Sequence, residues 1–403
     1  MSLIVMKFGG SSVADTERVQ NVARRVTDSY KEGNSVVVVV SAQGDTTDDF
    51  IEKAAALNKN PSKREMDVLL SAGEQISMSL LAMAIENLGF PVVSLTGWQA
   101  GIETDSKYSS ARIHRVKSER ISNEIDKKNI VIVAGFQGIN KYDDITTLGR
   151  GGSDTTAVAL AVALHADICE IYTDVDGVYT ADPRIVKNAQ KLNDISYDEM
   201  LELASLGANV LHNRSVELAL KYNMPLAVKT SFERVEGTIV KEVNKVEKML
   251  VRGVTRDNDV ARISVQGLDD TPGKAFQIFS MLAKHGVNVD VILQSAGSDN
   301  TNSISFTVTK ANAQLAGEKI KENLDRFGAK SVEVDESVSK VSIVGAGMSS
   351  NAGVAAKMFE ALYDKNINIQ MISTSEIKVS VIIAEEDAER AVVAVHDKFD
   401  LGR

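Results

Sequence analysis

The short stretch "KFGGSS" near the N-terminus holds a lysine and two adjacent glycines directly after an apolar run. Lys7 supplies a mobile positive charge, and Gly9 and Gly10 allow backbone N–H groups to approach an anion closely. The spacing matches neither the P-loop pattern nor the dinucleotide-binding fingerprint. Two interpretations are therefore open for this stretch, a phosphate-binding loop and a tight structural turn.

A second glycine-containing loop, "TTLGRGGSDTTAVALAVALHA", runs into a strongly apolar helical stretch. Arg150, Gly151 and Gly152 come just before Ser153 and Asp154 at the start of that stretch. Glycines at a helix N-terminus form an anion site, and an arginine can bind a carboxylate through two N–H groups. The alternative is a simple N-cap preceded by flexible glycines. Two such loops in one sheet favour the anion site.

A third loop, "YTDVDGVYTADPRI", contains three aspartates and could suggest calcium binding. An EF-hand needs ligands at alternating positions, glycine at the sixth and glutamate at the twelfth. Here Gly177 stands fourth and no matching glutamate follows. A turn-rich nucleotide-binding edge fits better, with Tyr179 as a flat face and Arg184 as a phosphate ligand.

These loops follow short β-rich runs that alternate with helical patterns as far as about residue 230. The expected strands are Leu3–Phe8, Ser35–Ser41, Pro91–Leu95, Ile130–Ala134, Ile168–Thr173 and Pro225–Lys229. Several are continuous Val/Ile runs, which is typical of strands buried on both faces. A helix is expected after the first strand, capped by Asp15 and ending before Gly33. The alternation predicts an α/β fold with a mainly parallel sheet, whose ligands bind at the carboxyl ends of the strands.

After the charged stretch "KEVNKVEK" the sequence contains an internal repeat. An offset of 80 pairs Gly273 with Gly353 and Asn288 with Asn368 without gaps. Each copy predicts the order strand, helix, strand, strand, helix of a ferredoxin-like module. The first copy continues into a last strand, "SVEVDE", which the second lacks. We therefore expect "MLVRGVTRD" to complete the second module, with the first module inserted into it.

Composition excludes several classes of protein. The 403 residues are 44% hydrophobic and 25% charged, with a formal net charge of −10, which argues against a nucleic-acid or anionic-membrane partner. The single cysteine, Cys169, allows no internal disulfide and lies in an expected buried strand. The five histidines are scattered without metal-ligand spacing, so no resident metal is expected. No signal peptide is recognisable and the longest apolar runs are too short to span a bilayer, so we expect a cytoplasmic protein.

The three loops belong to a set of motifs that includes "SAQGDTTD", "SAGEQIS" and, near the end, "ISTSEI". With these motifs the sequence resembles the aspartate kinases over essentially its whole length. The resemblance implies an amino-acid-kinase catalytic domain over residues 1–245 and a regulatory region over 246–403. That region would hold two ferredoxin-like βαββαβ ACT domains, the first at about 262–336 and the second at about 246–261 plus 340–403. It implies MgATP-dependent phosphorylation of the β-carboxylate of L-aspartate to 4-phospho-L-aspartate, on the route to lysine, threonine and methionine.

Site roles are carried over from the resemblance position by position. It implies that Lys7, with Gly9 and Gly10, holds the phosphoryl group, and that Asp154 orients the reacting groups. The implied contacts to aspartate are Glu74 with the α-ammonium, Arg150 with the α-carboxylate, and Ser41, Thr47 and Ser153 lining the pocket. The implied nucleotide-binding residues are Lys7, Phe8, Gly9, Gly10, Thr173, Asp174, Tyr179, Asp182 and Arg184. A carboxylate nucleophile is already ionised at neutral pH, so the reaction requires no general base.

The sequence departs from the family pattern at two places. Many relatives carry a lysine in "GAKVLH", where this chain has "GANVLH" with Asn209, and Lys229 is a guessed replacement. Relatives regulated by lysine plus threonine have His-Pro-Gly-Val-Thr where this chain has "NAGVA", with Ala352 and Ala355. The second departure leaves open whether lysine is an effector.

The ACT resemblance implies feedback inhibition by lysine and/or threonine, and a homo-oligomer, dimer or tetramer, formed through these domains. The implied effector contacts are Asp270, Gly273, Ala275, Asn288, Asp290, Gln294, Ser375 and Glu376. A separate regulatory chain could start near Met249. One alternative is a kinase of the same fold acting on acetylglutamate, carbamate or a nucleoside monophosphate, against which "SAQGDTTD" and the ACT pair argue. The other is a catalytically inactive amino-acid sensor, against which the presence of Lys7, Glu74, Arg150 and Asp154 together argues. A fusion with homoserine dehydrogenase is not expected, since nothing follows the second ACT module.

Overall fold

The computed structural model describes residues 2–208, 210–242, 250–296, 301–346, 348 and 351–403. These residues form two compact units. The first holds the described residues of 2–178, 191–204 and 210–242, and the second holds those of 179–190, 205–208 and 250–403. Two short segments of the N-terminal half therefore belong to the second unit. Each unit is described by itself.

The first unit is built on an eight-stranded sheet with the order β10-β12-β11-β9-β1-β2-β6-β3. Its strands are β1 (Leu3–Phe8), β2 (Ser35–Val40), β3 (Val92–Leu95), β6 (Ile130–Ala134), β9 (Ile168–Thr173), β10 (Asp194–Ile195), β11 (Leu226–Thr230) and β12 (Thr238–Val240). All neighbouring pairs are parallel except β11 with β12. The six expected strands are confirmed, three with the expected bounds and three shifted at their ends by one residue.

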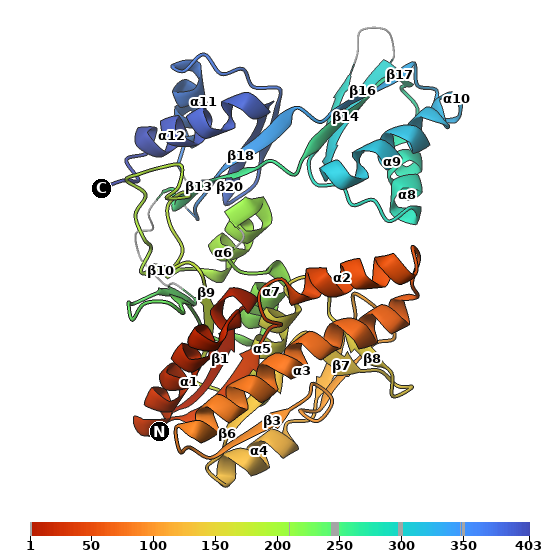
Figure 1. The fold of residues 1–403 in the computed structure, drawn as a ribbon. Coiled ribbons are helices and arrows are strands. Elements are labelled where there is room, and N and C mark those ends of the chain that lie inside the picture. Colours follow the sequence, from red (N-terminus) through yellow and green to blue (C-terminus); the bar gives the residue numbers. More distant parts are fainter. Residues whose placement is uncertain (1, 209, 243–249, 297–300, 347, 349–350) are drawn as a thin grey trace. The chain divides into compact units, whose positions relative to one another are not determined.

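Helices cover both faces of this sheet, as Figure 1 shows. The helices of the unit are α1 (Thr16–Lys31), α2 (Thr46–Leu57), α3 (Lys63–Asn87), α4 (Glu119–Asp126), α5 (Gly152–Ala163), α6 (Tyr197–Leu203) and α7 (Asn213–Tyr222), and a 3-10 turn spans Gly10–Val13. Apolar residues of α1 and α3 pack with β1, β2 and β6 in one core cluster. On the other face, α5 is buried along most of its length and packs on the strands and on α7. Asp15 caps α1 as expected, because its side chain accepts a hydrogen bond from Arg18 N at 2.9 Å.

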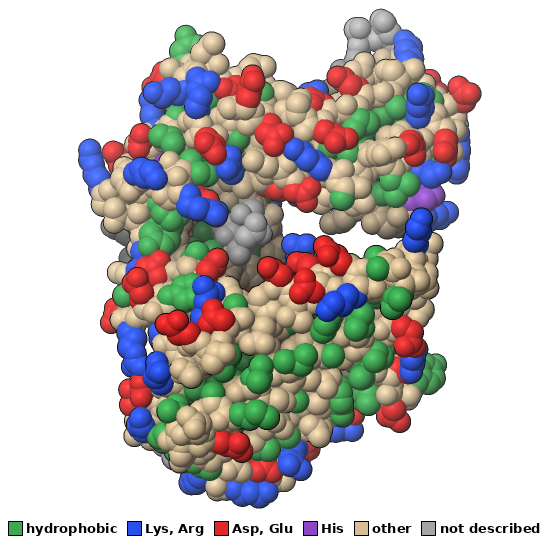
Figure 2. All heavy atoms as spheres, viewed as in Figure 1, with side chains coloured by type: hydrophobic (Ala, Val, Ile, Leu, Met, Phe, Trp, Pro, Cys, Tyr) green, Lys and Arg blue, Asp and Glu red, His purple; other side chains and the backbone are tan. Residues whose placement is uncertain are grey.

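Among the described helices, α3 is the one that is long and apolar enough to cross a membrane by length and composition. Its buried residues Met78, Leu81 and Ile85 instead belong to the core of the first unit. Figure 2 shows apolar side chains on the surface over α3. The exposed apolar residues of this helix include Ile76 and Met83. The helix is therefore a core helix that also carries an apolar outer face.

A second, smaller sheet in the first unit was not expected from the sequence. Its order is β5-β4-β7-β8, with β4 (Ile102–Thr104), β5 (Ile113–Val116), β7 (Gln137–Ile139) and β8 (Ile145–Thr147). Each strand has only three or four residues, which is too short for a periodic pattern to stand out. This sheet matters for the site because β8 leads directly into the loop with Arg150.

The second unit contains two four-stranded sheets, with the orders β15-β16-β14-β17 and β13-β18-β20-β19. The first consists of β14 (Ala261–Asp269), β15 (Ile292–Ala296), β16 (Thr301–Val308) and β17 (Ser331–Asp335), with α8 (Lys274–Lys284), α9 (Lys310–Lys321) and α10 (Leu324–Phe327). The second consists of β13 (Gly253–Asp257), β18 (Val338–Val344), β19 (Met371–Thr374) and β20 (Lys378–Ala384), with α11 (Val354–Tyr363) and α12 (Ala388–Lys398). In its sheet β13 lies beside β18, at the place that β17 holds beside β14.

The segment 179–190 packs into the second of these modules. Ala181 and Val186 belong to the core cluster formed by β13, β18, β20, α11 and α12. Thr180 Oγ1 lies 2.9 Å from Nε2 of His396, a side chain with no exposed surface. Thr180 O accepts a hydrogen bond from Val254 N at 2.8 Å. This part of the "YTDVDGVYTADPRI" loop is thus an integral piece of the second unit.

Candidate active site

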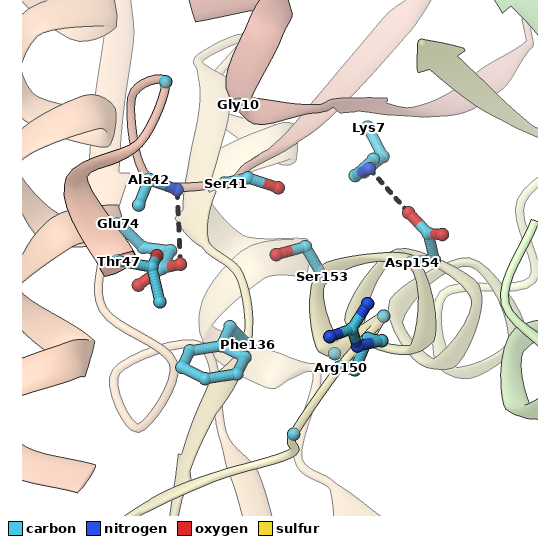
Figure 3. A pocket seen from close by; sticks show the side chains of 14 residues that line it. Lys7, Gly10, Ser41, Ala42, Thr47, Glu74, Phe136, Arg150, Ser153 and Asp154 are labelled. Atoms are coloured by element: carbon cyan, nitrogen blue, oxygen red, sulfur yellow. Dashed lines mark hydrogen bonds and ion pairs between the residues drawn. The ribbon is translucent and has the colours of Figure 1, made fainter. Parts of the chain in front are cut away.

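A pocket of about 280 Å³ lies in the first unit, where β1, β2 and β6 end. It is lined by Lys7, Gly10, Ser41, Ala42, Gly44, Thr47, Glu74, Phe136, Gly149, Arg150, Gly151, Gly152, Ser153 and Asp154. The structure therefore brings together the first two glycine-containing loops and every residue to which the sequence assigned aspartate binding or catalysis. Figure 3 shows Glu74 and Thr47 on one side of the pocket and Lys7 and Asp154 on the other.

Lys7 and Asp154 form an ion pair in which Nζ lies 2.6 Å from Oδ1. Lys7 extends from β1, and Asp154 lies in the first turn of α5. Each side chain is only 12% exposed, so solvent weakens their attraction less than it does at a surface. The backbone N–H groups at the start of α5 add partial positive charge here. The result is an ammonium group held in place beside a helix N-terminus, which suits a phosphate oxygen.

Glycines are required in the loops because other chain segments come very close. A Cβ on Gly10 would lie 2.7 Å from the carbonyl oxygen of Ala42. Gly151 has φ of +67°, and a Cβ there would lie 2.2 Å from the His212 ring. Such contacts are sterically impossible for larger residues without a shift of the backbone. The glycines of both loops therefore serve the shape of the pocket as well as access to its N–H groups.

Glu74 is a buried carboxylate on the pocket wall, 4% exposed. Its Oε1 accepts a hydrogen bond from Ala42 N at 3.2 Å, whereas Oε2 has no partner among the described residues. Burial raises the pKa of Glu74 to about 8, and the hydrogen bond from Ala42 N only partly opposes this. An unpaired buried carboxylate is costly unless a cation completes it. Glu74 is thus poised to receive a positively charged group.

Arg150 is exposed and lies in the loop between β8 and α5. Its side chain forms no ion pair or hydrogen bond within the described part of the chain, so its guanidinium can donate two hydrogen bonds to a carboxylate. Ser41 and Ser153 lie between the Glu74 side and the Lys7 side of the pocket (Figure 3). The pocket therefore offers one site for a cation, one for a carboxylate and one for a phosphate.

Four of the residues assigned to the nucleotide lie in the first unit but do not line this pocket, namely Phe8, Gly9, Thr173 and Asp174. The side chain of Phe8 is fully buried and stacks on Tyr172, with ring centroids 4.6 Å apart. Thr173 ends β9, and its Oγ1 donates a hydrogen bond to Asp174 Oδ1 at 3.0 Å.

The other three residues assigned to the nucleotide, Tyr179, Asp182 and Arg184, belong to the second unit. Arg184 Nη2 lies 2.7 Å from Asp182 Oδ2. Hydrogen bonds from Arg184 lower the pKa of the Asp182 carboxyl. The set that the sequence treated as one nucleotide site is therefore divided between the two units, and its joint role stays a prediction.

Lys229, the guessed substitute for the family lysine, is already paired. Its ammonium binds Glu170, a buried carboxylate that also accepts a hydrogen bond from Tyr172 OH at 2.8 Å. Asn209 itself lies outside the described residues. The pairing gives Lys229 a structural task on β11, so the guess draws no support from the geometry.

Sequence reasoning missed Phe136, which lines the pocket with a φ of +67°. Its signal was its place directly after the strand Ile130–Ala134, because loops at the carboxyl ends of neighbouring parallel strands meet at one edge. It also missed Ala42, whose N–H holds Glu74. No side-chain signal could have found that contact, since the donor is backbone.

The candidate effector residues lie in the two modules of the second unit. Asp270 accepts a hydrogen bond from Asn302 Nδ2 at 2.8 Å. Asp290 forms an ion pair of 2.6 Å with Lys340, a buried residue of β18. Gly273 precedes α8, Ala275 lies in it, Asn288 follows it, Gln294 lies in β15, and Ser375 and Glu376 follow β19. Their role as effector contacts stays a prediction.

No group of three or more His, Cys, Asp or Glu side chains that could hold a metal ion is found in the described ranges. Cys169 is buried, and burial raises the pKa of its thiol, so it is no nucleophile. The pocket is therefore equipped to bind and orient charged ligands rather than to attack with a side chain of its own.

Comparison with known families agrees with this geometry. Residues 2–230 match the amino acid kinase family, and residues 263–324 and 341–399 match an ACT domain family. The chain therefore belongs to the amino acid kinase family, and its α/β fold with C-terminal ACT domains is the one expected from the sequence.

Similar proteins show to which group within the amino acid kinase family the chain belongs. Aspartokinase 2 of Bacillus subtilis is 50% identical over 404 residues, covering 100% of this chain and 99% of the relative. An aspartokinase of Corynebacterium glutamicum is 51% identical over 408 residues, covering 100% and 97%. The crystal structure of E. coli aspartokinase III with aspartate and ADP superposes with a TM-score of 0.81 at 26% identity, covering 98% and 99%. Within its family the chain groups with the aspartate kinases.

Proposed function

We propose that the pocket transfers the γ-phosphoryl group of MgATP to the β-carboxylate of L-aspartate, giving 4-phospho-L-aspartate. One observation carries the proposal: Glu74 and Arg150, which have a free carboxylate oxygen and an unpaired guanidinium as far as the described residues go, share a single pocket with a lysine at a helix N-terminus. These groups complement the α-ammonium, the α-carboxylate and the transferring phosphoryl group in turn. The solved complex of E. coli aspartokinase III with aspartate and ADP supports the same substrate class.

In this proposal Glu74 binds the α-ammonium and Arg150 the α-carboxylate of aspartate. Thr47, Ser41 and Ser153 hydrogen-bond the substrate between them. Glu74 and Arg150 together form an amino-acid clamp, which turns the β-carboxylate toward Lys7. The hydroxyl groups add hydrogen bonds that glutamate, which is one methylene longer, would not match in the same pose.

The phosphoryl group is received by Lys7 and by the backbone N–H groups around Gly10, while Asp154 fixes the position of the Lys7 ammonium. The β-carboxylate is ionised at neutral pH and attacks without a general base. The barrier is therefore mainly the approach of two anions, which positive groups and alignment lower.

Mg²⁺ enters with the nucleotide. In proteins it is usually bound through one or two carboxylates, water and the phosphates of the substrate. Asp154 is the pocket carboxylate beside Lys7, so the donor set fits this mode of binding. The ion would neutralise charge on the phosphates. Thr173, Asp174, Tyr179, Asp182 and Arg184 are proposed to hold the nucleotide.

Regulation is proposed for residues 246–403, with a first ACT domain at about 262–336 inserted into a second at about 246–261 plus 340–403. Lysine and/or threonine would inhibit from there. E. coli aspartokinase III has been solved with lysine and aspartate, and it superposes with a TM-score of 0.76 at 26% identity, covering 98% of this chain and 99% of the relative. We further propose a cytoplasmic homo-oligomer joined through these domains. A regulatory chain starting near Met249 is part of the proposal, although that residue lies outside the described ones.

A hydroxamate assay with MgATP tests the proposal directly, because hydroxylamine traps acyl phosphates. Aspartate should give hydroxamate, whereas glutamate, acetylglutamate and carbamate should not. Addition of lysine, threonine or both should lower the rate. Turnover of another acceptor in preference to aspartate would move the chain to a different kinase, and effector binding without any turnover would indicate a sensor.

A further inference from the structure

Asp67 is a buried carboxylate in α3, seven residues before Glu74, and its side chain has no exposed surface. Ser109 N donates to its two oxygens at 3.0 and 2.9 Å, and Ser109 Oγ at 3.3 Å. Thr147 N donates to Oδ2 at 2.9 Å and Thr147 Oγ1 to Oδ1 at 2.8 Å. In the described part of the chain it has no ion-pair partner. Its charge is therefore met by hydrogen bonds from two loop segments alone.

Both of those segments border the Arg150 loop. Thr147 ends β8, three residues before Arg150, and its carbonyl oxygen accepts a hydrogen bond from Ala111 N at 2.9 Å. Ser109 has a φ of +66°, and its carbonyl oxygen would lie 3.0 Å from a Cβ on Gly149. A strained residue persists only where its surroundings hold it. The hydrogen bonds to Asp67 keep Ser109 in this conformation, and Gly149 of the Arg150 loop packs against the Ser109 carbonyl.

Arg214 holds the same loop from α7. Its Nη1 donates to Leu148 O at 2.6 Å, and its Nη2 donates to Ala111 O at 3.0 Å. Leu148 N in turn donates to Phe136 O at 2.8 Å. Leu148 is thus held through both its N–H and its carbonyl group, and Thr147 before it is held by Asp67.

We propose that Asp67 is a positioning residue that sets the place of the Arg150 guanidinium through the hydrogen bonds it accepts from Ser109 and Thr147. The inference rests on the proposed function, in which Arg150 binds the α-carboxylate of aspartate. Arg150 itself is exposed, and its side chain has no hydrogen bond or ion pair with any residue that the structure describes. The backbone of its loop therefore decides where its charge lies. In the proposed function Glu74, on the same helix, binds the α-ammonium group, which is attached to the same carbon as the α-carboxylate. Helix α3 thus positions one of these two contacts directly and the other through Asp67.

The test is Asp67→Asn, assayed for hydroxamate with aspartate and ATP varied in turn. An amide in place of the carboxylate turns N–H groups toward the N–H and O–H donors of Ser109 and Thr147, so the loop must move. We expect the apparent KM for aspartate to rise about tenfold or more and that for ATP to change less than about twofold. Ser77→Ala is the matched control. Its side chain is equally buried in α3, and its one hydrogen bond to a described residue goes to Gly73 O of its own helix, so both KM values should stay unchanged.

Combination with Arg150→Ala separates this inference from the proposed function. If Asp67 acts through Arg150, Asp67→Asn should raise the KM for aspartate no further in the Arg150→Ala background. An equal further rise there would overturn the positioning role while leaving the clamp intact. Failure of Arg150→Ala alone to raise this KM would refute the clamp itself, and the positioning role with it. An Asp67→Asn enzyme with a lower melting temperature and a normal KM would show a merely structural carboxylate.

Thr147→Val keeps the experiment decisive if Asp67→Asn does not fold. It removes one hydroxyl donor at nearly constant shape and leaves the backbone N–H in place. The KM for aspartate should rise by about two- to fivefold with kcat preserved. Thr147→Ser, which restores the hydroxyl, should return it to the wild-type value. Equal KM values for all three enzymes would overturn the proposal.

Discussion

Lys7 Nζ lies 2.6 Å from Asp154 Oδ1, so the first strand of the chain and the N-terminus of α5 meet through one shielded ion pair. The pair is the contact between the loops that carry "KFGGSS" and "GRGGSD". Because each partner restrains the other, the ammonium group is in place before a phosphate arrives. Preorganised charge of this kind lowers a barrier without reorganisation during the reaction.

Lys7→Ala should abolish phosphoryl transfer with the fold retained. We expect kcat to fall by about 10³ or more, since a preorganised cation at the transferring group is lost. Asp154→Asn should give a smaller loss, because the lysine remains but is less restrained. Steady-state kinetics together with thermal unfolding measure both effects. Lys117→Ala removes a surface ion pair with Glu103 and should leave kcat unchanged. Normal turnover by Lys7→Ala would refute the role.

Arg150→Ala should act on aspartate and barely on ATP. The apparent KM for aspartate should rise by about 10²-fold, which corresponds to about 2.7 kcal/mol of lost binding. The comparison is Arg120→Ala, which removes a surface partner of Glu124 outside the pocket. Equal changes in the two KM values would mean that Arg150 does not bind the α-carboxylate.

Glu74 predicts a pH-dependent affinity for aspartate. With a pKa of about 8 in the empty pocket, its side chain is mainly protonated at pH 7, and the α-ammonium must displace that proton. The KM for aspartate should therefore fall as the pH rises from 6 to 8, by up to about tenfold per unit. Glu74→Gln should have a higher KM that is flat over this range. A wild-type KM independent of pH would contradict the assignment.

The same carboxyl group links stability to pH. Its pKa is raised from the ordinary value of 4.5 to about 8 in the folded chain. The folded state then holds a proton that the unfolded state has lost, so stability falls as the pH rises through this window. The melting temperature of the wild type should drop between pH 5 and 8 relative to that of Glu74→Gln. Parallel profiles for the two proteins would show that the group is ionised when the pocket is empty.

For His396, in the second unit, we expect stability to depend on pH in the opposite direction. Burial lowers its pKa below the ordinary 6.5. Its contribution to stability is therefore present above pH 6.5 and lost as the pH falls below it. His396→Gln can still hydrogen-bond Thr180, and its melting temperature should drop less than that of the wild type between pH 6.5 and 5. The exposed His285→Gln variant should track the wild type. A steeper loss in His396→Gln would contradict this account.

Sequence patterns predicted six of the eight strands of the central sheet, because several of them are unbroken Val/Ile runs, such as "SVVVVV" of β2, that are typical of burial on both faces. The short strands β10 and β12 were not expected. The pocket could be assembled because parallel strands bring the loops at their carboxyl ends to one edge. The small sheet of β4, β5, β7 and β8 gave no signal, since its strands are too short for periodicity. Asp67 was hidden for another reason: a polar residue inside a helical pattern is normally taken for a solvated face.

The packing of Tyr179, Asp182 and Arg184 in the second unit shows a different limit of sequence reasoning. Whether a turn-rich segment packs with the preceding strand or with a module far along the chain depends on distant residues such as His396. The spacing of residues within the segment does not reveal those long-range contacts. Phe8 likewise was grouped with its glycine neighbours, although strand alternation turns its ring into the core.

The packing of Ala181 and Val186 against α11 and α12 has a consequence for protein engineering. Expression of residues 1–245 alone would separate this stretch from the helices that cover it and expose its apolar side chains to water. A fragment that ends at residue 245 would thus contain an exposed apolar segment around Ala181 and Val186 and would tend to aggregate. An unregulated enzyme is therefore better obtained by point mutations in the full-length chain than by truncation.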